Sequence, residues 1–159
     1  QFGAEKVTVS EVLHLHPDTP GATICADLTK ADHIPSDSFD CIILTFTLQF
    51  IFAVRAAIRP VARILKPGGV ALLVFPGITQ ISRYDMDNWG EFWRFTSLSA
   101  RRLFEEVFRP VYVTVTTYGN VLAATASLQG LSSSELRREE LDHWDRDYEL
   151  VIGLRAVKR

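Results

Sequence analysis

The sequence predicts an α/β fold in which a doubly wound, mostly parallel sheet ends in an antiparallel pair of strands. Three observations support this prediction. Strand-like and helix-like segments alternate along the chain, the apolar run at 39–46 is typical of a buried parallel strand, and a Pro-Gly-Gly turn at 67–69 separates a helix from the next apolar strand. The 159 residues fit one domain, 1–159, that is long enough to bury a core.

Three strands are predicted before the first long helix. Two segments rich in β-branched residues, 6–15 and 22–28, flank the turn sequence His-Pro-Asp-Thr-Pro-Gly. The apolar run 39–46 follows a polar link and forms the third strand, covered on both faces. Cys25 and Cys41 fall inside predicted buried strands, so we expect small apolar side chains in a reducing compartment rather than a disulfide.

A helix and a further strand occupy the centre of the chain. Apolar residues recur at helical spacing over 48–66, and Pro60 within this pattern predicts a kink or a break near Arg59. The helix is expected to end at Lys66, because a Pro-Gly-Gly turn follows it. The apolar run 70–76 then predicts the next strand.

The C-terminal half continues the alternation. Residues 97–108 form an amphipathic helix pattern, and 110–119 alternate as a strand. A second apolar helix is expected to end at Gly130, and Ser132 with a glutamate three residues later favours another helix start. The last strand is predicted over 148–159.

Composition and charge exclude several classes of protein. The formal net charge is −2, so the composition does not indicate a basic surface that would bind nucleic acid. The most apolar region, 39–58, contains Asp40 and Arg55 and changes from β-like to helix-like, which does not fit a membrane span. No signal peptide opens the sequence, so we expect a cytoplasmic protein.

Two segments resemble a known family. Residues 26–51, with Ser-Phe-Asp leading into a strand, and residues 57–77, with Leu-Lys-Pro-Gly-Gly before the next strand, resemble class I S-adenosylmethionine-dependent methyltransferases, in particular the methyltransferase type 11 domain. The resemblance is close over 7–77, and the C-terminal part agrees in element order. It implies a Rossmann-like fold and S-adenosyl-L-methionine as cofactor.

The resemblance also implies cofactor-binding residues. Glu11 would accept hydrogen bonds from the ribose hydroxyls, and Asp27 from the adenine amino group, with Leu28 supplying a backbone N–H and apolar contact. Thr45 and Thr47 would face the crevice at the carboxyl ends of the strands. The alternatives are an exposed edge residue for Glu11, a cap for Asp27 and ordinary strand formers for the threonines.

The N-terminus departs from the family. Only Gln1–Glu5 precede the strand that resembles the family's second one, and Phe2-Gly3-Ala4 is not the glycine-rich loop. The absent first strand would lie between the second and fourth, which leaves two unpaired edges. Either those edges pair directly, or a partner chain fills the gap, or the sequence is part of a longer protein. We expect an N-terminally truncated sheet and a homo-oligomer, such as a domain-swapped dimer.

The segment 83–96 concentrates aromatic and charged residues after the fifth strand of the family. Long loops of this kind often bind substrates. Asp85 or Asp87 could orient or deprotonate an acceptor hydroxyl. The residues expected to bind the acceptor are Tyr84, Trp89, Trp93 and Arg94. The alternative is a lid whose aromatic side chains complete a small core.

The predicted function is methyl transfer from S-adenosyl-L-methionine to a small-molecule or sugar hydroxyl, with catalysis mainly by positioning. The alternatives are a non-catalytic interaction module that binds no cofactor, and a small hydrolase, which the absence of Gly-x-Ser-x-Gly disfavours. His14 and His16 lie near the carboxyl end of the first predicted strand, where solvated or capping roles are expected. A metal site there would need a third ligand.

Overall fold

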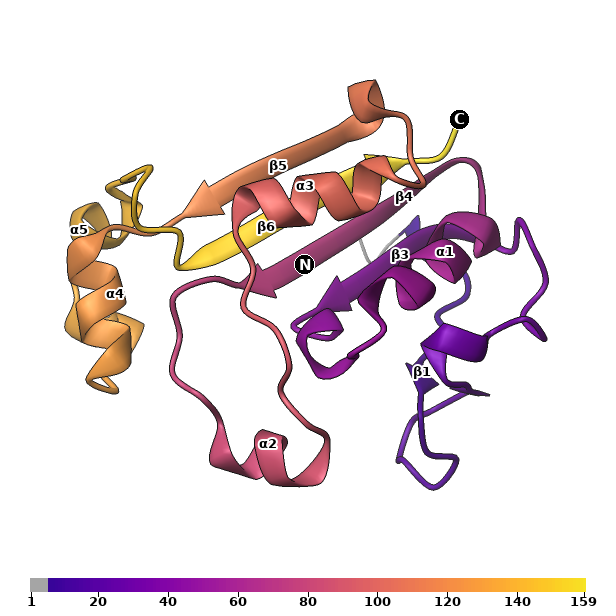
Figure 1. Cartoon of the computed structure of the whole chain (residues 1–159), viewed down its shortest axis with the longest axis horizontal. Helices are drawn as coiled ribbons and strands as arrows, with labels where there is room; N and C mark the ends of the chain where they lie inside the picture. Colours follow the sequence, from indigo (N-terminus) through magenta and orange to yellow (C-terminus); the bar gives the residue numbers. More distant parts are fainter. Residues whose placement is uncertain (1–5) are drawn as a thin grey trace.

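A computed structural model of the chain describes residues 6–159, so the Phe2-Gly3-Ala4 sequence lies outside the described residues. The strands form two separate sheets (Figure 1). The parallel pair β1–β2 makes one, and β3, β4, β6 and β5, in that spatial order, make the other. The strands are β1 (Leu13–His14), β2 (Ile24–Cys25), β3 (Phe39–Thr45), β4 (Leu65–Pro76), β5 (Val113–Tyr118) and β6 (Val151–Val157).

Helices of two kinds connect the strands. The α-helices are α1 (Val54–Ile64), α2 (Arg83–Asn88), α3 (Ser97–Glu105), α4 (Val121–Leu128) and α5 (Arg138–Asp142). The short 3₁₀ helices are η2 (Leu28–Lys30), η3 (Leu48–Phe50), η4 (Pro110–Tyr112) and η5 (Ser133–Glu135). Within residues 6–159, no helix is both long and apolar enough to cross a membrane.

The larger sheet confirms the predicted α/β fold with an antiparallel C-terminal pair. β3 and β4 are parallel, while β6 runs antiparallel to both of its neighbours, β4 and β5. The main core lies between this sheet and the helices α1 and α3, with Ile58, Phe75 and Phe104 at most 1% exposed. This packing fixes the four strands and the two helices as one unit.

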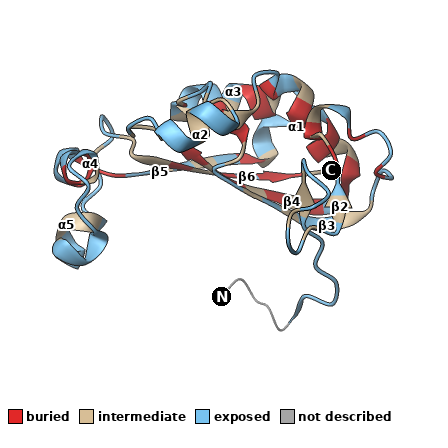
Figure 2. Ribbon diagram, turned by 90° about the horizontal axis from the view of Figure 1, so that it is seen from below, coloured by how far each residue is buried: buried red, intermediate tan, exposed pale blue. Residues whose placement is uncertain are grey.

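The expected cover on both faces of the sheet is not found among the described residues. The α-helices α1, α2 and α3 lie on one side of the sheet (Figure 2). Residues therefore alternate along β4, where Ala71, Leu73 and Phe75 are buried and those between them are partly exposed. On β3, Ile43 is 50% exposed. A continuous apolar run predicted two covered faces, but only one of them meets a helix.

The predicted strands at 6–15 and 22–28 are much shorter than expected. β1 and β2 contain two residues each, and the segment before Leu13 is mostly exposed. Cys25 and Cys41 are also exposed free cysteines, which corrects their predicted burial. β-branched residues form long strands only where neighbouring strands pair with them and where a layer covers them, and among the described residues one edge of β1 has no neighbour.

The helix α1 runs through Pro60 without a break, so of the predicted kink or break near Arg59 the break is wrong. Its buried face carries Val54, Ile58 and Val61, which hold it on the sheet. The helix ends at Ile64, and the Pro-Gly-Gly sequence lies within β4 as a local irregularity. Gly68 adopts a φ of 81°, and the register between β3 and β4 shifts there.

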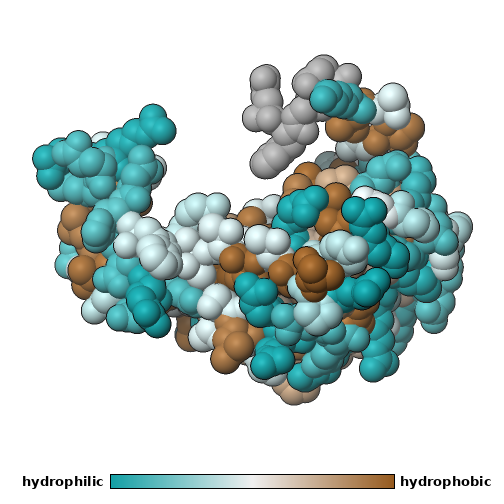
Figure 3. All heavy atoms as spheres, turned by 90° about the horizontal axis from the view of Figure 1, so that it is seen from above, coloured by the Kyte–Doolittle hydropathy of each residue, from teal (hydrophilic) through white to brown (hydrophobic). Residues whose placement is uncertain are grey.

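The segment between β5 and β6 forms a separate lobe made of α4, η5 and α5. It projects from one end of the sheet (Figure 1), and a hollow separates it from the rest of the surface (Figure 3). Asn120 caps α4, and its Nδ2 donates to the carbonyl oxygens of Glu140 and His143 at 2.8 and 2.6 Å. The capping box predicted at Ser132 is confirmed, although it begins a 3₁₀ turn.

Arg63 of α1 joins the two sheets. Its guanidinium donates to the carbonyl oxygens of Ala31 and Ile34 at 2.7 and 2.6 Å, in the link that leads from β2 to β3. Beside these bonds, Ala31 and Ile34 pack with Ile64 in a small apolar cluster. Helix α1 therefore positions the small sheet against the larger one.

Replacing Arg63 by Met should destabilise the attachment of the small sheet. The variant loses charge-assisted hydrogen bonds to two carbonyl groups, so the free energy of unfolding should fall by about 1.5–3 kcal/mol. Urea denaturation measures this change. Arg59→Met, at an exposed position of the same helix, is the matched control and should change the stability by less than about 0.5 kcal/mol. Equal losses in both variants would contradict the proposed role of Arg63.

Candidate functional site

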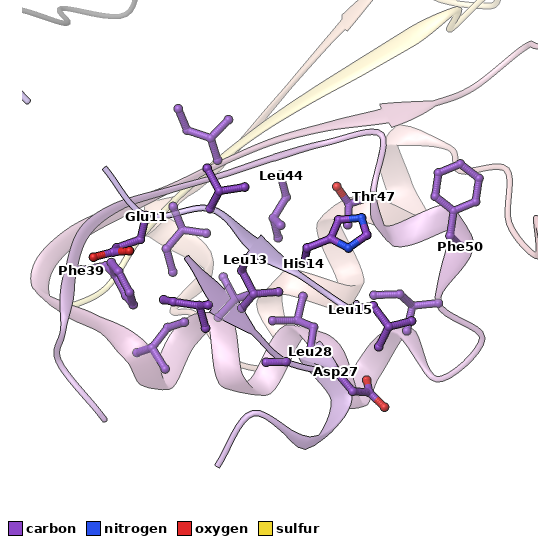
Figure 4. Close-up of a pocket in the computed structure, with 18 of the residues that line it drawn as sticks. Glu11, Leu13, His14, Leu15, Asp27, Leu28, Phe39, Leu44, Thr47 and Phe50 are labelled. Carbon is purple, nitrogen blue, oxygen red and sulfur yellow. The ribbon is translucent and has the colours of Figure 1, made fainter. Parts of the chain in front are cut away.

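A cavity of about 670 Å³ lies between the two sheets. Apolar side chains from the facing edges line it, together with residues of α1 (Figure 4). They include Leu13 and Ile24 of the small sheet, Ile42 and Leu44 of β3, and Val61 and Ile64 of α1. The volume lies within the usual range for small-molecule sites.

The polar residues of the cavity lie mainly at the carboxyl end of the strands. His14 ends β1, Asp27 follows β2, and Thr47 follows β3. Figure 4 shows Glu11 at the opposite end of the cavity, beside Phe39, the first residue of β3. Glu11 was predicted toward the end of its strand, but it precedes β1, because that strand begins only at Leu13.

Asp27 has the capping role that was considered for it. As the N-cap of η2, its Oδ1 accepts hydrogen bonds from the Thr29 backbone N–H and hydroxyl at 2.8 and 2.7 Å. These bonds, first the hydroxyl and then the N–H, lower the pKa of the Asp27 carboxyl below its ordinary value. The group is therefore ionised at neutral pH, and within residues 6–159 its Oδ2 accepts no hydrogen bond.

The other predicted cofactor residues differ in their access to the cavity. Leu28 and Thr47 line it, whereas Thr45 does not. The Thr47 hydroxyl donates to the Thr45 carbonyl oxygen at 3.2 Å. Between the two threonines, Phe46 adopts a φ of 49°, an uncommon conformation for a side-chain-bearing residue, and this turn directs the chain away from the sheet.

The predicted acceptor loop contains the short helix α2. Ser82 caps this helix by accepting a hydrogen bond from the Asp85 backbone N–H at 3.2 Å. Asp85 and Trp89 line the cavity. Of the six candidates in this loop, only these two reach it.

The other four candidates are engaged elsewhere or face solvent. Tyr84 is 71% exposed, and Asp87 lies 3.7 Å from Arg83. Trp93 donates to the Ile51 carbonyl oxygen at 3.1 Å and stacks on Phe52. Arg94 pairs with Glu91 at 2.9 Å and donates to the Gln80 carbonyl oxygen at 2.6 Å. These contacts support the alternative in which part of the loop forms its own small core.

Two histidines contribute to the site in a way that the sequence did not predict. The ring of Trp89 lies 5.4 Å from that of His16 and 6.4 Å from that of His14. His14 also lines the cavity. Its position at the end of a parallel strand is the signal that could have identified it. No cluster of three potential metal ligands occurs among residues 6–159.

The facing edges of β1 and β3 are not paired with each other in the described part of the chain. This finding excludes direct pairing, the first of the three alternatives for the gap. The cavity occupies the gap, and no glycine-rich loop lies in it among residues 6–159. The strand ends therefore supply one side of a candidate ligand site.

Comparisons with known proteins agree with this arrangement. Residues 6–73 match the family described as the methyltransferase domain. A possible histamine N-methyltransferase from Thermotoga maritima has a similar structure, with a TM-score of 0.56 and 16% identity, over 87% of this chain and 65% of that protein. A methyltransferase from Mesorhizobium loti has a TM-score of 0.54 and 22% identity. The similarity covers 90% of this chain and 72% of that one.

A third similar structure contains the cofactor. It is phosphoethanolamine N-methyltransferase 2 of Haemonchus contortus in complex with S-adenosyl-L-methionine, with a TM-score of 0.51 and 15% identity. The similarity covers 85% of this chain and 36% of that one. No curated protein matches the sequence.

The expected fold is thus confirmed by the sheet order, by the family match and by the similar structures. The chain therefore has the fold of S-adenosylmethionine-dependent methyltransferases, and its residues 6–73 match the methyltransferase domain family.

Proposed function

We propose that the chain binds S-adenosyl-L-methionine across the carboxyl ends of β1, β2 and β3, and that the protein methylates a hydroxyl group of a small molecule or sugar. The observation that carries the proposal is the Asp27 carboxylate, which Thr29 holds through one oxygen while the other accepts no hydrogen bond from residues 6–159. Ligands of open α/β sheets bind at this edge.

The residues present fit the nucleoside part of the cofactor. Asp27 can accept a hydrogen bond from the adenine amino group, and the side chain of Leu28 can pack against the base. Thr47 adds a hydroxyl on the β3 side of the same cavity. Apolar side chains line the remainder of the cavity, which suits a flat heterocycle.

Asp85 is the proposed general base. The bound cofactor supplies an electrophilic methyl group on a sulfonium sulfur. Asp85 would accept the proton of the acceptor hydroxyl and hold the acceptor oxygen toward the methyl group that a bound cofactor would supply. Its place on the cavity wall supports this role, whereas Asp87 points toward Arg83.

Trp89 is the proposed acceptor-binding residue, because its ring lies on the cavity wall close to Asp85 in the chain. An indole face suits a sugar ring or another flat acceptor. The exposed free cysteines Cys25 and Cys41 support action in a reducing compartment such as the cytoplasm.

A second candidate function is an interaction module that binds no cofactor. The edges of β1 and β3 that no strand within residues 6–159 pairs with favour it, since such edges offer backbone groups to another chain. Calorimetry with S-adenosyl-L-methionine and its demethylated product distinguishes the two functions. The methyltransferase proposal predicts saturable binding, and no binding at millimolar ligand would contradict it.

Replacing Asp27 by Asn should weaken this binding without removing the cap. The Asn side-chain oxygen can still accept from Thr29, but its NH₂ group cannot accept from the adenine amino group. We expect the Kd to rise about tenfold. Asp32→Asn, at an exposed position in the following link, is the control and should leave the Kd unchanged. An unchanged Kd in Asp27→Asn would show that the residue is not a ligand contact.

Ligand binding should also change the fluorescence of Trp89. This side chain is 42% exposed at the cavity, so a bound cofactor or acceptor alters its surroundings. Titration of Trp89→Phe should show little change in emission. Trp144→Phe, which removes an indole bonded to Thr117 outside the cavity, should retain the change. A signal lost only in Trp144→Phe would place the ligand elsewhere.

Self-association through the incomplete sheet is proposed as well. In the described part of the chain, the strand edges without a partner and the sheet face without a helix, where Ile43 is half-exposed, favour a homo-oligomer such as a dimer. Size-exclusion chromatography with light scattering should give a mass above the 17.9 kDa of one chain at micromolar concentration. A clean monomer there would contradict this proposal.

A further inference from the structure

The hydrogen bonds of His14 determine which ring nitrogen carries the proton. The backbone N–H of His16 lies 3.1 Å from His14 Nδ1, and the Thr19 hydroxyl lies 2.7 Å from the same atom. A backbone N–H can only donate, so Nδ1 is the acceptor and the neutral ring carries its proton on Nε2. Within residues 6–159, no hydrogen bond engages Nε2. The ring therefore presents a free donor.

The β1–β2 ladder places this donor near Asp27. His14 pairs with Cys25, and the Ala26 backbone N–H donates to the His14 carbonyl oxygen at 3.0 Å. Asp27 therefore follows at the same edge, one strand spacing of about 4.8 Å to the side. Figure 4 shows the His14 ring beside Thr47, at the end of the cavity where Asp27 also lies. A nucleoside with its base at Asp27 has its sugar beside the end of β1.

Glu11 is too far along the chain to share this position. It precedes His14 by three residues, which in extended backbone is about 10 Å. Its carboxylate lies beside Phe39, at the amino end of β3 (Figure 4). The family resemblance suggests that Glu11 binds the ribose. This role would require a ligand that extends from the carboxyl ends of the strands to their amino ends.

Aromatic contacts fix the His14 ring in place. Trp89 meets it edge-on, with an interplanar angle of 87°, and the His16 ring lies 5.9 Å away. Trp89 comes from the end of α2, so the acceptor loop contacts the end of β1 directly. A donor held on two sides by aromatic rings keeps its direction when a ligand enters the cavity.

We propose that His14 binds the ribose of the cofactor, with its Nε2–H donating to a ribose hydroxyl oxygen. This inference rests on the proposed function, because it requires a nucleoside in the cavity. It assigns the sugar to a neutral histidine whose tautomer is set by Thr19 and the His16 backbone, rather than to a carboxylate.

The test compares adenosine with 2′,3′-dideoxyadenosine by calorimetry on the full chain. Wild type should bind adenosine about tenfold more tightly, because the dideoxy compound leaves Nε2–H without a partner. His14→Ala should bind both compounds equally, and Glu11→Gln should retain the wild-type ratio. Thr19→Val, which keeps the ring, should reduce the ratio. Long-range ¹⁵N NMR of wild type should show Nε2 protonated and Nδ1 unprotonated.

The outcomes separate this inference from the proposed function. Two results would overturn the role of His14 alone. In the first, His14→Ala still prefers adenosine to the dideoxy compound as strongly as wild type does. In the second, Glu11→Gln loses this preference. A protonated Nδ1 in the wild-type spectrum would also overturn it. No binding of adenosine or S-adenosyl-L-homocysteine at millimolar concentration would overturn the proposed function and this inference together.

Discussion

The attachment of α1 to both sheets is the interaction on which the site depends. No backbone hydrogen bond joins β1 to β3 in the described part of the chain, so the ladder that normally aligns neighbouring strands stops there. Arg63 and the apolar cluster around Ile34 and Ile64 hold the small sheet instead. Their position leaves a space between the strand edges, and this space is the cavity.

The site combines short segments from distant parts of the sequence. His14, Asp27 and Thr47, at the ends of β1, β2 and β3, line one cavity, and the loop after β4 places Trp89 against the histidine. The fold family supplies the arrangement, while the side chains decide which ligand can bind.

Elements with strong local signals were predictable from the sequence. β3, α1 and β4 follow from apolar periodicity and from the Pro-Gly-Gly sequence, and the Ser132 cap from its spacing. The short β1 was not predictable, because strand length depends on neighbours that the sequence does not reveal. For the same reason the exposed cysteines were assigned to the core.

The site was only partly predictable. Asp27 and Asp85 were identified and line the cavity, but the contacts of Trp93 with Ile51 and of Arg94 with Glu91 arise from tertiary packing. Backbone chemical-shift mapping during titration with S-adenosyl-L-homocysteine tests the central claim most directly. We predict the largest changes at 14–16, 27–28 and 46–48, with little change in α4 and α5. Changes confined to the lobe or spread evenly would contradict a ligand site at the strand ends.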